Sequence, residues 1–143
     1  MHYCWEEGWN NMKSLVKSGL IILHNGKFLI NRKKGTTLFL LPGGKPENNE
    51  TPVECLIREI YEEHECTVIV NSLVHCGIFE DVAANEPNTI ISIDLYYGRV
   101  EGTPKPSSEI EEQRWFGKND NKEILSPIIK NKILPFLIEK KMI

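Results

Sequence analysis

Hydrophobic positions near the start of the chain occur in short runs that are typical of β-strands. Two such runs cover residues 14–24 and 27–32 and are separated by Asn25-Gly26. This dipeptide supplies the positive φ angles that a two-residue hairpin turn requires. A third apolar run, 38–41, follows. The pattern therefore predicts a β-hairpin and a further apolar segment before residue 42.

The period then changes to that of a helix over residues 52–64. Thr51 can act as the N-cap, Pro52 takes the first helical position, and Glu54 completes a T-x-x-E capping box. Apolar residues recur at the spacing of one helix face and predict a buried stripe. The stripe consists of Val53, Leu56, Ile57 and Ile60.

Two longer strands are predicted in the second half, over 67–79 and 89–101. In the second of them apolar and polar residues alternate, which is typical of a strand with one buried face. A last strand is expected through Trp115-Phe116.

The chain closes with a helix from about residue 127, capped by Ser126, with Pro135 expected to kink it. Its apolar face can pack on the sheet of its own chain or on a second copy, so a homodimer stays open. Strands mixed with two substantial helices predict an α+β fold, an α/β/α sandwich with a mixed β-sheet between helices.

Composition narrows the class of protein. With 143 residues, 41% hydrophobic and 26% charged, the chain fits one globular domain spanning 1–143, in which 1–11 is a candidate N-terminal extension. A net charge of −3 and no Lys/Arg-rich block argue against a nucleic-acid polymer as partner. No apolar run reaches the roughly 20 residues that span a membrane. The first residues lack a secretory signal pattern, so we expect a cytoplasmic location.

The cysteines carry no pattern of their own. Cys4, Cys55, Cys66 and Cys76 include no CxxC pair and no histidine at zinc-site spacing. We expect all of them to be reduced and structural.

The chemistry is concentrated in the predicted helix 52–64. Glu59, Glu62 and Glu63 stand at i, i+3 and i+4, which places them on one side of a helix. Carboxylates this close repel one another unless a cation lies among them. Oxygen-only ligands suit a hard divalent cation such as Mg²⁺, which joins carboxylates to substrate phosphates. The segment therefore predicts a metal site for phosphate chemistry.

The same residues belong to a longer motif. Gly44, five residues, Glu50, seven residues and then 58–63, REIYEE, resemble the Nudix box, G-x5-E-x7-R-E-U-x-E-E-x-G-U, where U is apolar. The box ends at Cys66. One position departs from it, because Glu65 stands where the box has its final glycine. A left-handed helix end costs a residue other than glycine about 1 kcal/mol or more, so a local loss of stability is expected.

The resemblance implies a ligand set for the metal. Glu59, Glu62 and Glu63 match the box glutamates that hold a divalent metal, Mg²⁺ or alternatively Mn²⁺. The carbonyl of Gly43 matches a backbone ligand found in members of the family. Arg58, paired with Glu50, matches the residues that brace the loop and orient the glutamates.

Further roles follow from the same resemblance. Lys45 and Arg32 occupy places where basic side chains meet substrate phosphates. Members of the family also use an acid from a later loop, for which Glu109 is the first candidate and Glu111 and Glu112 are alternatives. The general base that deprotonates the attacking water stays open between Glu62, Glu59 and Glu109.

The implied reaction is hydrolysis of the diphosphate bridge of a nucleoside diphosphate linked to another group, releasing a nucleoside monophosphate. Subfamily signatures outside the box are absent, and Asp81 and Val82 occupy the place of one of them. This favours a nucleoside triphosphate or modified nucleotide over ADP-ribose or a sugar nucleotide. Asp94 and Asn85 are hypothetical substrate-binding residues. A non-catalytic nucleotide-sensing module is the competing class.

Overall fold

A computed structural model describes residues 12–143 of the chain. The predicted extension 1–11 and Cys4 lie outside the described residues. The elements of the described part follow in this order: β1 Lys13–Ile21, β2 Leu23–His24, β3 Lys27–Lys33, β4 Gly43–Gly44, α2 Pro52–His64, β5 Thr67–Val68, η1 Val70–Ser72, β6 Val74–Val82, β7 Thr89–Tyr97, β8 Val100–Glu101, β9 Ile110–Phe116, η2 Lys122–Ile124, η3 Ile129–Ile133 and α3 Leu134–Glu139. Here η1 and η2 are 3₁₀ turns and η3 is a π-helical segment.

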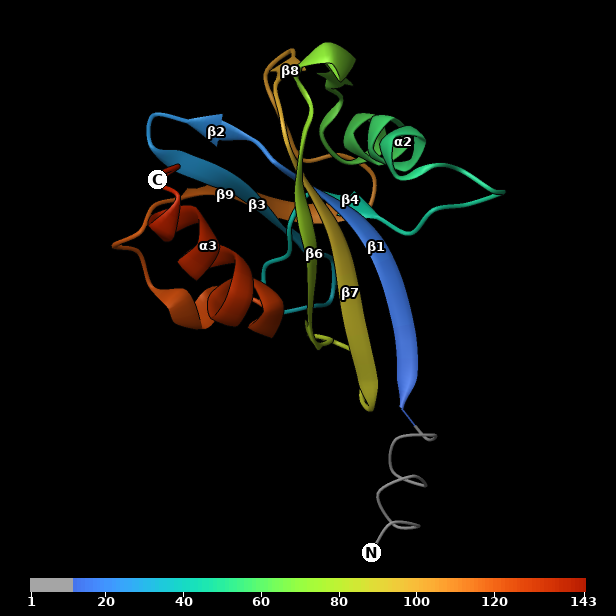
Figure 1. Ribbon diagram of the computed structural model, residues 1–143, viewed down its shortest axis with the longest axis vertical. Helices are drawn as coiled ribbons and strands as arrows, with labels where there is room; N and C mark the ends of the chain where they lie inside the picture. The colour runs from blue at the N-terminus through green and yellow to red at the C-terminus, as the bar shows by residue number, and fades with distance from the viewer. Residues whose placement is uncertain (1–11) are drawn as a thin grey trace, which may run out of the picture.

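The strands form mixed and antiparallel sheets. In the larger sheet the order is β4-β1-β7-β6, with β1 and β7 parallel and the other neighbours antiparallel. A second sheet has the order β2-β3-β9 and is antiparallel, and β5 pairs with β8 as a short ribbon. In Figure 1, α2 and α3 lie on opposite sides of these strands. The predicted sandwich of strands between helices is confirmed.

The predicted hairpin is present, with one correction. Asn25 and Gly26 have φ of 52° and 75°, as a tight turn between β2 and β3 requires. The expected strand 14–24, however, is divided at Ile22 into β1 and β2, which belong to different sheets. The chain thus passes from one sheet to the other before the turn.

Helix α2 begins as its capping signals predict. The Glu54 N–H donates to Thr51 Oγ1 at 3.1 Å, and the Thr51 N–H donates to Glu54 Oε1 at 2.9 Å. Its buried stripe differs from the prediction, because Ile57 is 38% exposed and Cys55 is buried instead. The cause is tertiary: strand β4 packs on the Cys55 side of the helix, where the Cys55 thiol donates to the Gly44 carbonyl.

Two other strand predictions are corrected in their bounds. The expected strand 67–79 is interrupted by the turn η1, so that it forms β5 and then β6, which continues to Val82. The expected strand 89–101 ends at Tyr97 as β7 and resumes as β8. Both breaks fall where the chain passes between the larger sheet and the β5–β8 ribbon.

The predicted kink near Pro135 takes the form of a π-helical segment. The Leu134 N–H donates to the Ile129 carbonyl, five residues back, before α3 continues. Proline has no N–H and its ring crowds the carbonyl four residues before it, and a wider turn accommodates both effects. The expected cap by the Ser126 side chain is not formed, since its Oγ has no hydrogen-bond partner among the described residues.

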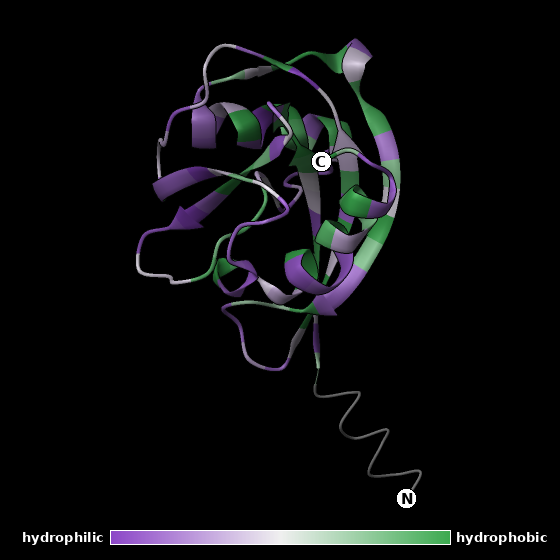
Figure 2. Ribbon diagram, turned by 90° about the vertical axis from the view of Figure 1, so that its left-hand side faces the viewer, coloured by the Kyte–Doolittle hydropathy of each residue, from purple (hydrophilic) through white to green (hydrophobic). Residues whose placement is uncertain are grey.

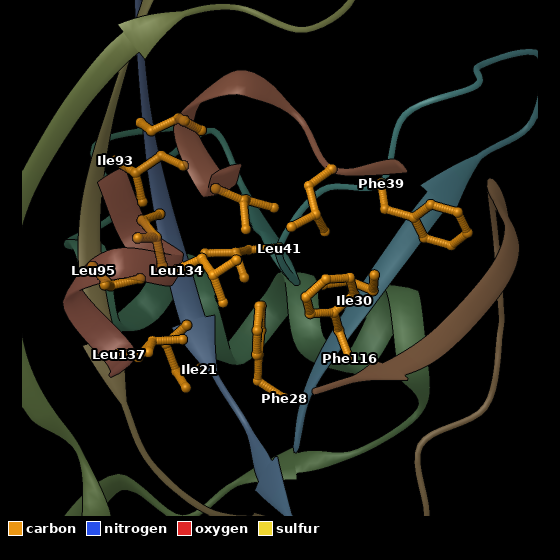
Figure 3. Packing of buried hydrophobic residues seen from close by; sticks show 14 of the residues in the cluster. Ile21, Phe28, Ile30, Phe39, Leu41, Ile93, Leu95, Phe116, Leu134 and Leu137 are labelled. Atoms are coloured by element: carbon orange, nitrogen blue, oxygen red, sulfur yellow. The ribbon is translucent and has the colours of Figure 1, made fainter. Parts of the chain in front are cut away.

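Alternating residues of the strands bury side chains on both faces, which produces two apolar clusters. The larger cluster lies between the strands and the C-terminal helical region (Figure 3), and Figure 2 shows hydrophobic and hydrophilic residues interleaved along that region. It contains Ile21, Phe28, Ile30, Phe39, Leu41, Ile91, Ile93, Leu95, Phe116, Leu125, Ile128, Ile129, Ile133, Leu134 and Leu137. The smaller one lies under α2 and contains Leu20, Ile22, Leu29, Leu56, Ile60, Cys66 and Val68.

Two further predictions concern thiols and membranes. Cys55, Cys66 and Cys76 are free thiols in the described chain, in agreement with the expectation for them. No helix within residues 12–143 combines the length and the apolar character needed to cross a membrane.

Candidate functional site

The Gly-Gly turn of β4 brings the chain into close contact with β1 and α2. Gly43 has φ of 137°, and a Cβ there would lie 2.0 Å from the Ser18 carbonyl oxygen. A Cβ on Gly44 would lie 1.7 Å from Glu59 Oε2. Only glycine therefore fits at position 43, and a larger residue at position 44 would displace the Glu59 carboxylate from the space that it occupies.

Glu63 lies deeper than its neighbours on α2. Its side chain is buried, 3% exposed, and its Oε1 accepts a hydrogen bond from the Gly43 N–H at 2.9 Å. Burial raises the pKa of Glu63 to about 8, the Gly43 hydrogen bond opposes that rise, and the nearby Glu59 carboxylate adds to it. A buried carboxylate of this kind favours a cation beside it.

Arg58 joins the acidic residues into one network. Its Nε and Nη2 donate to Glu50 at 2.8 and 2.9 Å, a bidentate pair. Its Nη1 donates to Glu59 and to Glu62, each at 2.8 Å, and Nη2 also reaches the Lys45 carbonyl at 3.0 Å. The hydrogen bond to Glu50 is the main reason that the pKa of Arg58 is raised, and the same contact lowers the pKa of Glu50. The predicted contact between Arg58 and Glu50 is thus present in the structure.

A groove of about 310 Å³ runs beside these carboxylates. Burial raises the pKa of the Glu59 carboxyl in its wall, although Arg58 opposes the change. Burial, followed by the charge of Lys33, lowers the pKa of Lys17. Lysines and carboxylates therefore face the same space. The groove is lined by Lys17, Lys33, Gly44, Lys45, Glu47, Arg58, Glu59 and Glu86.

Glu109 reaches the same region from the loop before β9. Its Oε1 lies 3.4 Å from Lys33 Nζ, and its charge is one of the influences that raise the pKa of Glu63. Of the two alternative acids, Glu112 is engaged by Arg32 and Arg114, and Glu111 is exposed, as Glu109 is. Of the three, Glu109 is the acid that the loop brings next to the α2 carboxylates.

The structure does not bring Arg32 or Asp94 to the groove. Arg32 donates to the Thr36 carbonyl at 2.8 Å and to Glu112 at 3.3 Å, and it is not part of the groove lining. Asp94, on β7, bonds His75 on the neighbouring strand β6. Neither residue is part of the groove lining, and a role for either in substrate binding stays a prediction. Asn85 lies in an exposed loop outside the groove lining.

Two lysines in the groove, Lys17 and Lys33, were not predicted from the sequence. Lys33 stands two residues after Asn31, whose side chain contacts His64 of α2, so the alternation of side chains along β3 places Lys33 on the α2 side and Arg32 on the other. Lys17 interrupts an apolar strand run, which was the available signal for it.

A narrow cavity of about 30 Å³ continues from the groove and shares Lys17, Lys33 and Gly44 with it. Ser126 lines the cavity, and its buried Oγ is the one described side-chain atom of its kind without a hydrogen-bond partner. A cavity of this size has room for a water molecule that would satisfy the hydroxyl. The groove, and not this cavity, has the volume for a larger ligand.

The donor set fits a divalent cation. Within residues 12–143, no group of three or more His, Cys, Asp or Glu side chains is arranged so that it could hold a metal ion. Glu59, Glu62 and Glu63 nevertheless offer only oxygen atoms, and burial disfavours the charge on two of them. Oxygen ligands with room for water and phosphate are what Mg²⁺ and Mn²⁺ accept.

Comparison with known protein families identifies the family of this chain. The family model of the NUDIX domain matches residues 15–137. The chain belongs to the NUDIX domain family. The family, the fold and the enzyme class predicted from the sequence are thereby confirmed.

Curated relatives match at moderate identity. An 8-oxo-dGTP diphosphatase of Proteus vulgaris is 32% identical over 76 residues, which cover 51% of this chain and 63% of that protein. An ADP-ribose pyrophosphatase of Methanocaldococcus jannaschii is 30% identical over 109 residues, which cover 75% of this chain and 63% of that protein. The Nudix chain thus spans less than two thirds of the length of both relatives.

Solved structures match the fold. A NUDIX hydrolase from Nitrosomonas europaea has a TM-score of 0.72 at 21% identity, covering 90% of this chain and 91% of that one. A bifunctional NMN adenylyltransferase/ADP ribose pyrophosphatase from Francisella tularensis, complexed with AMP and a Mn ion, has a TM-score of 0.64 at 18% identity. This chain covers 46% of that protein, and 96% of this chain is matched. At such identities these structures establish the Nudix fold alone.

Proposed function

We propose that this Nudix protein is a Mg²⁺-dependent pyrophosphohydrolase that cleaves the diphosphate bridge of a nucleotide and releases a nucleoside monophosphate. The observation that carries the proposal is the groove in which the Glu59 carboxylate faces Lys17, Lys33 and Lys45. Carboxylates that hold a cation, next to ammonium groups that neutralise phosphate oxygens, are the requirements for binding a diphosphate.

Glu59, Glu62 and Glu63, with the Gly43 carbonyl, are the residues proposed to hold Mg²⁺, and Mn²⁺ as an alternative. When bound, the cation supplies neutralisation of the diphosphate charge and acidifies the attacking water. Arg58 holds Glu59 and Glu62 in place, since its Nη1 donates to both carboxylates. The Mn ion in the Francisella tularensis protein supports a divalent cation in this fold.

The chain itself then performs two tasks. The lysine side chains hold the phosphates, while a carboxylate accepts the proton of the water whose oxygen attacks phosphorus. The new P–O bond forms as the bridging P–O bond breaks, and the bridging oxygen leaves with the other phosphorylated half. Glu62, Glu59 and Glu109 are the candidates for the proton acceptor. Glu109 has the support of its place beside Lys33.

The names of the relatives support the substrate class. The Proteus vulgaris protein is an 8-oxo-dGTP diphosphatase, which favours a nucleoside triphosphate or a modified nucleotide as substrate. The second candidate is ADP-ribose, which the Methanocaldococcus jannaschii protein favours by its name. Both substrates carry the diphosphate that the groove is proposed to bind.

The whole chain, 1–143, is proposed to act as a single catalytic unit in the cytoplasm. The free thiols of Cys55, Cys66 and Cys76 support that compartment, because disulfides form and persist in oxidising ones. Its partner is a small nucleotide.

Product analysis tests the proposal. Purified protein with Mg²⁺ is incubated with nucleoside triphosphates, oxidised nucleotides, ADP-ribose and sugar nucleotides, and products are separated by chromatography. A nucleoside monophosphate is the expected product, and its formation should fall by a factor on the order of 10²–10³ in a Glu62→Gln, Glu63→Gln variant. The matched control is Glu80→Gln, Glu101→Gln, which removes the same charge from two exposed positions.

The outcomes separate the classes of function. Turnover that the first variant loses and the control keeps supports the hydrolase, and the cleaved compound identifies the substrate class. Binding of nucleotide without product from any compound would contradict the proposal and favour a non-catalytic sensor.

A further inference from the structure

A histidine at the end of α2 is buried and clamped between two strands. His64 is 0% exposed, with Nε2 at 2.9 Å from Asn31 Nδ2 and Nδ1 at 2.8 Å from Gln113 Oε1. Asn31 on β3 and Gln113 on β9 are directly opposite each other in the sheet register. One imidazole thus cross-links the last turn of α2 to two strands of the second sheet.

The hydrogen bonds fix where the imidazole carries its proton. Gln113 Nε2 donates to the Pro104 carbonyl at 2.8 Å, so the other end of the amide, Oε1, must face His64. Oε1 can only accept, and Nδ1 of His64 therefore carries the hydrogen. In a neutral ring Nε2 then accepts from the Asn31 amide. Burial also lowers the pKa of His64.

The same clamp holds the loop that precedes β9. The Ser107 N–H donates to the Glu63 carbonyl at 2.9 Å, and the Lys105 N–H donates to the His64 carbonyl at 3.3 Å. Gln113 secures the start of this loop through Pro104. The loop ends at Glu109, which lies beside Lys33. The loop that ends at Glu109 is therefore attached to the last turn of α2 by two backbone hydrogen bonds and, through Gln113, by the His64 imidazole.

The end of α2 makes such a clamp useful. The helix ends at Glu65 in the left-handed conformation, φ 54° and ψ 36°, without the glycine that favours it. Its last turn contains Glu63, whose carboxylate is buried and whose burial opposes its charge. Because the left-handed Glu65 and the buried Glu63 carboxylate are both unfavourable, we expect other contacts to stabilise the last turn of α2.

We propose that His64, as its Nδ1–H tautomer, is a positioning residue that fixes Glu63 on α2 and Glu109 on the following loop relative to each other. The proposal rests on the proposed function, since it assigns His64 a part in the same cation and phosphate site. His64 acts through Asn31, Gln113 and the loop and is not itself expected to contact substrate.

The test compares His64→Leu, which removes both hydrogen bonds, with His64→Gln, whose amide can both donate and accept. His64→Leu should lower kcat by about 10–100-fold, the size of effect known for residues that orient metal ligands, and raise the Mg²⁺ concentration for half-maximal effect. KM for the nucleotide should change less than kcat. His64→Gln should recover part of the lost activity.

A destabilised control separates positioning from folding. Leu137→Ala removes a buried side chain from the cluster on the opposite face of the strands and should leave the site intact. Activity is compared per folded molecule. If His64→Leu loses no more activity than Leu137→Ala on this scale, the proposal is overturned. If His64→Leu fails to fold, Gln113→Met replaces it in the test. Gln113 is partly exposed, and this change removes the Oε1 that accepts the hydrogen bond from His64 Nδ1.

Two readouts do not need turnover. Nitrogen-15 NMR of the imidazole in the wild-type protein should show Nδ1 protonated and Nε2 not, and the opposite tautomer would overturn the proposal. Mg²⁺ binding, measured by calorimetry, should be weaker in Gln113→Met than in wild type. If the wild type binds Mg²⁺ but turns over no compound, the proposed hydrolase fails, and the calorimetric difference still decides the role of His64.

Discussion

Helix α2 and the C-terminal helical region cover opposite faces of the same strands with different kinds of side chain. Towards the strands α2 buries Leu56 and Ile60, and it also buries Glu63 and His64 in its last turns. The C-terminal region, η3 and α3, buries apolar side chains in the corresponding place (Figure 3). These include Ile129, Ile133, Leu134 and Leu137.

The two regions contribute to the free energy of folding in opposite ways: the polar burial under α2 is unfavourable, and the apolar burial under the C-terminal helical region is favourable. Burying a carboxylate is unfavourable unless it is paired, and Glu63 has only one backbone hydrogen bond in the described structure. An apolar side chain such as Leu137 contributes roughly 1.5–3 kcal/mol when it is fully buried. We infer that the cluster over the C-terminal helix offsets the unfavourable burial under α2. A cation bound at α2 would then add stability by mass action.

The largest expected effect is on stability and comes from breaking the C-terminal side. Leu137→Ala should lower the free energy of unfolding by about 2–5 kcal/mol, because it removes a fully buried leucine. Glu63→Gln should lower it little or raise it in metal-free protein, since the amide keeps the Gly43 hydrogen bond and carries no charge. Urea unfolding with and without Mg²⁺ measures both. A greater loss for Glu63→Gln than for Leu137→Ala would contradict the comparison.

A second prediction sharpens the role of charge on α2. Arg58→Lys keeps the charge but cannot bond Glu50 in bidentate fashion while also reaching Glu59 and Glu62. Activity should fall by about 10–100-fold, as expected for a residue that orients metal ligands. Steady-state kinetics at several Mg²⁺ concentrations measure the effect.

The control for that change is Arg114→Lys. Arg114 also bonds a carboxylate, Glu112, at 2.7 Å, but its side chain is exposed and lies outside the groove lining. Its replacement should leave activity within a factor of about two, because exposed ion pairs contribute 0–1 kcal/mol. Equal losses in the two variants would show that arginine at position 58 has no special bracing role.

The parts of the fold that follow from local chemistry were predictable. The capping box at Thr51 and the turn at Asn25-Gly26 depend on residues next to one another, and both are present. The acidic spacing of α2 depends on the helix period alone. What such reasoning missed depends on distant contacts. The Cys55 side of α2 is buried because β4 packs there.

Two residues of the site, Lys33 and His64, could not be predicted from the sequence. Lys33 rather than Arg32 lines the groove, because β3 turns the side of Asn31 and Lys33 towards α2, and the local sequence does not show which side of the strand that is. The role of His64 has no local signal in the sequence, because its partners Asn31 and Gln113 lie 33 and 49 residues away in the chain. Residues whose role arises from tertiary contacts become visible only when the strands are placed.

The smallest expected effect concerns the departure from the Nudix box at the end of α2. Glu65→Gly should stabilise the protein relative to Glu65→Ala by about 1 kcal/mol, because glycine adopts φ of 54° without the steric cost that any Cβ brings. Both variants remove the Lys105 ion pair, 3.4 Å long and exposed, so their difference isolates the backbone. The greater freedom of glycine in the unfolded chain opposes the gain and keeps it small.

Thermal and urea unfolding of the two variants measure this difference. If Glu65→Gly and Glu65→Ala are equally stable, the strain of the left-handed helix end is no larger than the conformational entropy that glycine loses on folding, and the prediction of a net gain is wrong. If glycine is more stable by the expected amount and kcat is unchanged, the strain at the helix end is separate from the chemistry. The last turn of α2 would then hold its carboxylate through the contacts of His64, and the missing glycine would cost stability alone.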